Sequence, residues 1–167
     1  MSDNSAKTLH QLVSTQRIKD IDHWIAKYPK DQKQSAVMST LRIVQEEHSH
    51  LTKELMDAVA DYLDMPPIAV YEVASFYTMY EHEQVGRNLV NVCTNISCLL
   101  RDSAAVVEHL QRKLGIKLGE TTDDGRFTLR SVECLGACVN APMMQVNKDY
   151  HENLTPETIE KVLEQYQ

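Results

Sequence analysis

The chain contains four cysteines, and they form two short clusters. Four residues separate Cys93 from Cys98, and three residues, with Gly136 in the middle, separate Cys134 from Cys138. Structural zinc sites and iron–sulfur clusters are commonly held by about four cysteine thiolates. The C-x4-C…C-x3-C pattern therefore indicates a single four-thiolate site built from two segments of the chain.

Four kinds of chemistry are compatible with these thiols. They are a structural zinc site, a dithiol redox pair, two disulfides and a [2Fe–2S] cluster. The redox pair is disfavoured because Cys134 and Cys138 do not form the C-x-x-C arrangement that activates a thiolate. Disulfides are disfavoured because the polar N-terminus carries no secretory signal, and cytosolic thiols stay reduced. Spacing alone favours the cluster only slightly over zinc.

Composition and charge narrow the class of protein. The 167 residues are 43% hydrophobic and 25% charged, which is ordinary for a globular protein. The net charge is −7, of which residues 1–86 carry −5 and residues 87–167 carry −2. Neither half has the basic stripe that nucleic acid requires, and no apolar run approaches the length of a membrane span. We expect no nucleic-acid partner and no direct membrane insertion.

The first half of the sequence has helical patterns only. Four helices are predicted, starting near Ser14, after Ser35, at a Thr52 cap and at Pro67. Residues 1–13 are predicted to be a loose, disordered tail. We therefore expect an N-terminal helical bundle over residues 1–86.

The second half alternates between strands and helices. Strands are predicted at 89–92 and 126–132, each delivering one cysteine pair, and a short strand at 143–147 is expected beside the second of them. A helix capped by Ser103 and closed by Gly115, and a final helix capped by Thr155, complete the pattern. Residues 87–167 are thus predicted to be an α/β domain, which makes the whole chain α+β.

Both cysteine pairs stand where a predicted strand meets a loop. The 35 residues between the pairs are enough for a helix and a strand of crossover connection. Such a connection would return the second pair beside the first at one end of a sheet.

The residues around the cysteines resemble those of a known family. Cys134-Leu135-Gly136-Ala137-Cys138, followed by Ala141-Pro142, is similar to the second cysteine motif of the thioredoxin-like [2Fe–2S] ferredoxins. More narrowly, the chain resembles the 24-kilodalton, E-type subunit family of respiratory complex I, NADH:quinone oxidoreductase. The resemblance runs nearly continuously from about Tyr28 to the end and includes four further stretches: residues 70–79, 85–88, 114–128 and 153–157.

This resemblance implies a function. It implies a helical bundle followed by a thioredoxin-like domain, with Cys93, Cys98, Cys134 and Cys138 as the ligands of one [2Fe–2S] cluster and one cysteine pair on each iron. The cluster would exchange single electrons with the FMN of a partner flavoprotein subunit that also binds NADH. The chain itself has neither G-x-G-x-x-G nor a P-loop, so FMN and NADH are expected on that partner only.

The resemblance also implies where the protein works and what else it could be. Other peripheral-arm subunits of complex I are expected partners, at the cytoplasmic, inner face of the cell membrane. An equivalent subunit of an NAD-linked hydrogenase or formate dehydrogenase is the alternative, and a zinc-stabilised interaction module is a third hypothesis.

Four local features remain. The family often has glycine where this chain has Asp102, and glycine is more usual near Ser49. The acidic–histidine segment 46–50 is interpreted as a solvated helix end rather than a metal site. The aromatic run 76–80 is equally compatible with core packing and with a surface that faces a partner.

Overall fold

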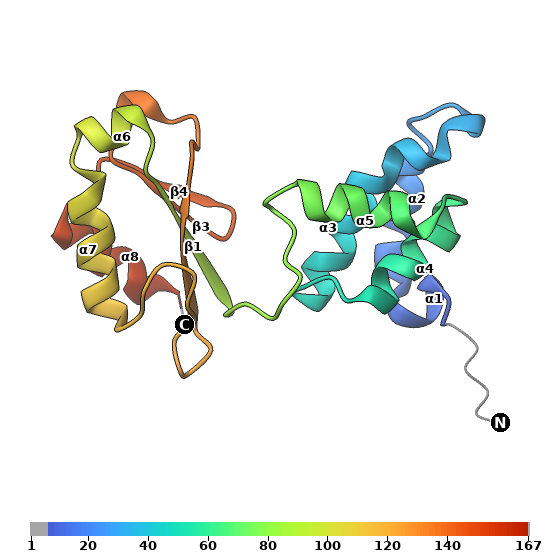
Figure 1. Cartoon of the computed structure of the whole chain (residues 1–167), viewed down its shortest axis with the longest axis horizontal. Coiled ribbons are helices and arrows are strands. Elements are labelled where there is room, and N and C mark those ends of the chain that lie inside the picture. The colour runs from blue at the N-terminus through green and yellow to red at the C-terminus, as the bar shows by residue number, and fades with distance from the viewer. Residues whose placement is uncertain (1–6, 167) are drawn as a thin grey trace. The chain divides into compact units, whose positions relative to one another are not determined.

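The computed structural model describes residues 7–166, and the chain divides into two compact units, Met1–Gln84 and Val85–Gln167. The first unit is helical and the second contains the sheet (Figure 1). In the described residues, no helix is both long and apolar enough to cross a membrane.

The N-terminal unit is a bundle of helices, as predicted. Its core is formed by fully buried aliphatic side chains from several helices, among them Ile21, Leu41, Val59 and Leu63. Thr52 caps one helix as expected, because its hydroxyl oxygen accepts the N–H of Leu55 at 3.3 Å. The elements are α1 (Leu9–Leu12), α2 (Thr15–Ile25), the 3₁₀ helix η1 (Lys30–Ala36), α3 (Val37–His48), α4 (Lys53–Leu63) and α5 (Pro67–Phe76).

The predicted loose tail over residues 1–13 is wrong for its described part. Leu9–Leu12 form the short helix α1, and Leu9 and Val13 are buried against the bundle. A capping box starts this helix, since Gln11 accepts the backbone N–H of Thr8 at 2.9 Å. Four residues are too few to show a helical period in the sequence. Residues 1–6 lie outside the described part of the chain.

The C-terminal unit is a four-stranded mixed sheet with helices. The sheet order is β2-β1-β3-β4, in which β1 and β2 are parallel and the other two pairs are antiparallel. The elements are β1 (Asn88–Cys93), α6 (Ile96–Leu100), α7 (Ser103–Leu114), β2 (Phe127–Val132), the 3₁₀ turn η2 (Cys138–Asn140), β3 (Met144–Val146), β4 (Asp149–His151) and α8 (Pro156–Gln165).

One face of this sheet forms the core of the unit. Alternate residues of β1, such as Val90 and Val92, join Leu129 of β2 and pack against Leu110 of α7 and Ile159 of α8. The two long helices α7 and α8 therefore cover the same face of the sheet (Figure 1). This arrangement holds β1 and β2 rigidly side by side.

The predicted position of the third strand is wrong. The strand pairs with β1, where Val92 lies opposite Met144, and not with β2. The hairpin partner β4 was not predicted, because three residues with two polar side chains show no alternating apolar pattern. Asn147, with a φ of 56°, forms the tight turn between β3 and β4.

Candidate functional site

The first cysteine pair lies at the C-terminal end of the central strand. Cys93 is the last residue of β1, is 4% exposed, and its N–H donates to the carbonyl of Met143 at 3.2 Å. The chain then turns into the short helix α6, where Cys98 is 1% exposed. Asn95 starts this helix, because its side-chain oxygen accepts the N–H of Ile96 at 2.7 Å. Both thiols are therefore held by buried, well-packed elements.

The second pair follows the neighbouring parallel strand. Cys93 of β1 lies in register with Val132, the last residue of β2, so the chain leaves both strands at the same edge of the sheet. Cys134 and Cys138 come directly after this edge, and both are exposed. The crossover return predicted from the sequence is confirmed.

Gly136 shapes the loop that joins the second pair. Its φ is +82°, a conformation that favours glycine, and a Cβ atom built there would meet nothing within 4 Å. Its N–H points to the sulfur of Cys134 at 3.4 Å. The glycine is thus required by the backbone conformation and not by crowding.

All four cysteines line one cavity of about 210 Å³. Asn95, Ile96 and Ser97 form the rest of its wall, so cysteines make up four of its seven lining residues. In residues 7–166, no three Cys, His, Asp or Glu side chains converge as ligands of a single metal ion. The structure thus places four cysteines around one cavity.

The two buried thiols have shifted pKa values. Burial works to raise the pKa of Cys93, but backbone N–H groups of Asn95 and Leu135 stabilise its thiolate, and the net effect lowers the pKa. Burial raises the pKa of the Cys98 thiol to about 11, with the neighbouring Cys93 adding to the shift. Backbone amides thus already point at sulfur in the first loop, which suits a site where thiolates need hydrogen bonds.

Exposed apolar side chains lie beside cysteines in both cysteine loops. Ile96 is 70% exposed, Leu99 58%, Leu100 80% and Val139 98%. Three of them, Ile96, Leu99 and Leu100, lie with Cys98 on α6, and Val139 follows Cys138 directly. We call these four residues the apolar rim. The sequence analysis did not single them out, although apolar residues next to all four cysteines are visible in the sequence.

Asp102, which stands where the family often has glycine, adopts a left-handed backbone conformation. Asp102 has a φ of +66° and stands at the N-cap of α7. The predicted Ser103 cap is therefore wrong by one residue, because Ser103 is already the first helical residue and is 1% exposed. Ser49, at the end of α3, has a φ of +69°. Both departures fall where glycine is the residue of least strain.

The acidic–histidine segment 46–50 is engaged in contacts within the bundle. Glu47 accepts the backbone N–H of Ser14 at 2.9 Å, and a ring nitrogen of His48 lies 2.9 Å from the carbonyl oxygen of Leu12. These contacts attach the end of α3 to the chain around α1. The segment thus has a structural role that requires no metal.

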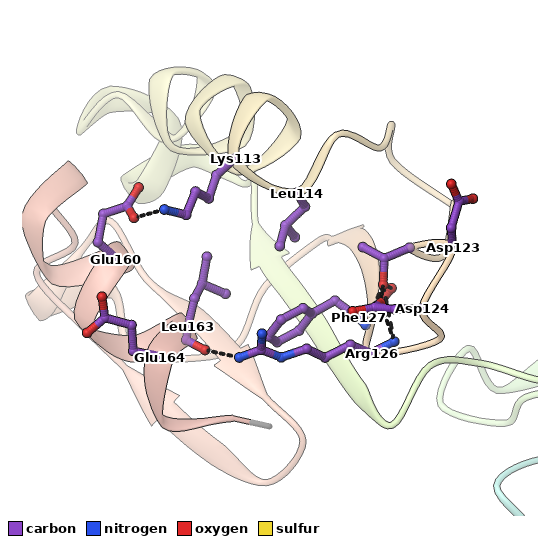
Figure 2. A pocket seen from close by; sticks show the side chains of 10 residues that line it. Lys113, Leu114, Asp123, Asp124, Arg126, Phe127, Glu160, Leu163 and Glu164 are labelled. Carbon is purple, nitrogen blue, oxygen red and sulfur yellow. Dashed lines mark hydrogen bonds and ion pairs between the residues drawn. The ribbon is translucent and has the colours of Figure 1, made fainter.

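A larger cavity of about 450 Å³ lies in the C-terminal unit between α7, α8 and the turn before β2 (Figure 2). Its cations are already used in contacts within the unit. Lys113 pairs with Glu160, and the guanidinium of Arg126 donates to the carbonyls of Tyr166 at 2.7 Å and Leu163 at 3.0 Å. The cavity walls therefore fix α8 to the start of β2.

The chain is similar to known proteins over most of its length. A model of the thioredoxin-like [2Fe-2S] ferredoxin family matches residues 21–167. An E-type subunit of NADH-quinone oxidoreductase from Rhizobium meliloti is 46% identical over 147 residues, which are 88% of this chain and 86% of that protein. "NADH dehydrogenase [ubiquinone] flavoprotein 2, mitochondrial" of Dictyostelium discoideum is 42% identical over 98% of this chain, which spans 66% of that protein.

A solved structure shares the fold. The crystal structure of an NAD+-reducing [NiFe]-hydrogenase in the air-oxidized state matches 83% of this chain with a TM-score of 0.69 and 20% sequence identity. This chain spans only 24% of the matched hydrogenase chain. The likeness concerns the fold alone.

Proposed function

Because the chain belongs to the thioredoxin-like [2Fe-2S] ferredoxin family, we propose that it is the electron-transfer subunit of an NADH:quinone oxidoreductase, respiratory complex I. Cys93, Cys98, Cys134 and Cys138 hold its [2Fe-2S] cluster, one pair on each iron. The family implies this cofactor, and the ligand assignment rests on one observation: the four thiols line a single cavity.

The donor set fits such a cluster. Four cysteines and no carboxylate or imidazole line the cavity, and thiolates are the usual ligands of iron–sulfur clusters. When bound, the cluster supplies a centre that takes up and gives back one electron. Cys93 and Cys98 anchor it on buried elements, while backbone N–H groups of Asn95 and Leu135 direct hydrogen bonds to sulfur and so influence the potential.

The partner at this site is the flavoprotein subunit that binds FMN and NADH. The exposed pair Cys134 and Cys138 lies beside the apolar rim, and an exposed apolar surface of this kind favours docking of another protein. Such docking would remove water from both cysteines. Docking there brings the flavin close to the cluster and excludes water from the contact. Through this partner and other subunits of the peripheral arm, the protein is held at the inner face of the cell membrane.

The ligand assignment is tested with Cys98→Ser and Cys134→Ser in anaerobically purified protein. We expect about two irons per wild-type chain, and changed visible and EPR spectra or lost iron in each variant. Ser97→Ala is the matched control, because Ser97 lines the same cavity without a thiol. Wild-type spectra in both cysteine variants, or stoichiometric zinc in a colourless wild-type protein, would contradict the proposal.

The assembly is tested by identifying the subunits that co-purify with the tagged chain in its source organism. Complex I subunits are the expected result. Co-purification with a hydrogenase or a formate dehydrogenase subunit would replace complex I with the corresponding NAD-linked enzyme.

A further inference from the structure

Helix α5 carries apolar side chains on two opposite sides. Val70 and Ala74 are fully buried against the bundle. On the other side, Ile68 is 62% exposed and Phe76 is 77% exposed, with Glu72 midway between them. Positions 68, 72 and 76 are one helical turn apart, so they form a straight stripe on the outer face. A helix with apolar side chains on two opposite sides is typical of an element that is covered on both of them.

The stripe continues into the loop that follows. Tyr77 is 39% exposed and Met79 51% exposed, and the ring of Phe76 stacks edge-on against Tyr77 at 5.0 Å. Tyr80 anchors this loop, because it is 4% exposed and its hydroxyl donates to the carbonyl of Met38 at 2.9 Å. The exposed aromatic and methionine side chains are therefore held in place. Of the two interpretations of the run 76–80, core packing applies to Tyr80 and surface exposure to the residues before it.

The charge on this surface is nearly zero. Between positions 65 and 80 the sequence has a single charged residue, Glu72. Within residues 7–166 the structure gives its carboxylate no hydrogen-bond or ion-pair partner. A partner that covered the stripe would remove water from this carboxylate, and a buried carboxylate must then be paired with a cation.

We propose that the stripe Ile68, Glu72 and Phe76, with Tyr77 and Met79, docks in an apolar groove of a neighbouring subunit that places a Lys or Arg opposite Glu72. The contact is a helix in a groove, with Phe76 as the aromatic anchor. The inference rests on the proposed function only in that the chain is part of a multi-subunit enzyme. It adds a docking surface on the helical unit to the one at the cysteine loops.

A second copy of this chain is a poorer occupant. Two stripes packed about a two-fold axis through their centres would bring the two Glu72 carboxylates together. Like charges at a desolvated contact are strongly unfavourable, and the stripe has no cation to offset them. The single central acid therefore favours a different, basic partner.

The test uses the full tagged chain in its source organism after deletion of the native gene. The amounts of the other oxidoreductase subunits that co-purify with each variant are measured per mole of tagged chain. We expect Phe76→Ser and Glu72→Arg to lower these amounts at least about tenfold, as for central anchors of other interfaces. Tyr28→Ser and Asp61→Arg are the controls, since Tyr28 is a 36% exposed aromatic and Asp61 an exposed acid of the same unit, both outside the stripe.

Two further readouts separate the possible outcomes. Iron content and EPR spectra should be those of the wild type in all four variants, because none touches a cysteine, and the isolated chain should sediment as a monomer. Wild-type co-purification of Phe76→Ser and Glu72→Arg would overturn the inference, as would a wild-type dimer that either variant dissociates. A wild-type chain that binds its cluster but co-purifies with no such partner would refute the assembly itself.

Discussion

The loop between Cys134 and Cys138 offers a direct test of how the fold holds the proposed cluster. Gly136 has a φ of +82°, and no atom outside residues 135–137 lies within 4 Å of the position that a Cβ would take. Gly136→Ala therefore causes no clash. It destabilises the native loop by about 1–2 kcal/mol, because alanine is strained in the left-handed backbone conformation. If the native loop must open to release the cluster, this cost raises the open population about 5- to 30-fold.

The measurement is the rate at which visible absorbance is lost when the reconstituted protein is exposed to an iron chelator. Gly125→Ala is the matched control, because Gly125 has a φ of +64°, equally open surroundings and a place in the turn before β2, at the opposite end of that strand from Cys134. Both variants should lower the melting temperature of the C-terminal unit by a similar amount. Only Gly136→Ala should release the cluster faster.

Two results would refute this reasoning. Cluster loss from Gly136→Ala at the wild-type rate would show that the loop conformation does not limit release. Equal acceleration by Gly125→Ala would show that release follows global unfolding of the unit and not opening of the cysteine loop.

Three further predictions concern stability. Ser49→Gly should stabilise the helical unit by about 0.5–1 kcal/mol in urea unfolding followed by Trp24, the only tryptophan, whereas Ser49→Ala should not. Arg126→Met should cost the C-terminal unit about 1–2 kcal/mol, because two carbonyls near the end of α8 lose their donor; an unchanged urea midpoint would contradict this role. Burial lowers the pKa of His151, so the folded state binds fewer protons than the unfolded state. The free energy of unfolding should therefore fall as the pH drops below about 6.5, by at most about 1.4 kcal/mol per pH unit. His151→Gln should flatten this pH dependence in thermal melts followed by CD.

The two departures from the family pattern show how a sequence difference acquires physical meaning. Glycine is usual near positions 49 and 102, and this chain has serine and aspartate there. Both residues adopt φ near +70° at a helix end, where the absence of a Cβ relieves strain. The family preference therefore reflects backbone conformation at these sites. The sequence alone raised the question of the loop conformation, and the dihedral angles answer it.

The sequence by itself determined the kinds of element and the chemistry of the site. Helical period, turn residues and strand alternation located the helical unit, β1 and β2, because these signals act over a few neighbouring residues. The cysteine spacing indicated one four-thiolate site, and the resemblance indicated which cofactor it holds. Short elements such as α1 and β4 were missed because three or four residues display no period.

Only the tertiary structure decided how these parts meet. Long-range packing placed β3 beside β1, buried Cys93 and Cys98, and left Cys134 and Cys138 exposed around the same cavity. It also decided which side of α5 faces the bundle, because a helix with apolar residues on both sides gives no sequence signal for its orientation. Ligand type is a property of each residue, whereas burial and convergence depend on contacts between residues far apart in the chain.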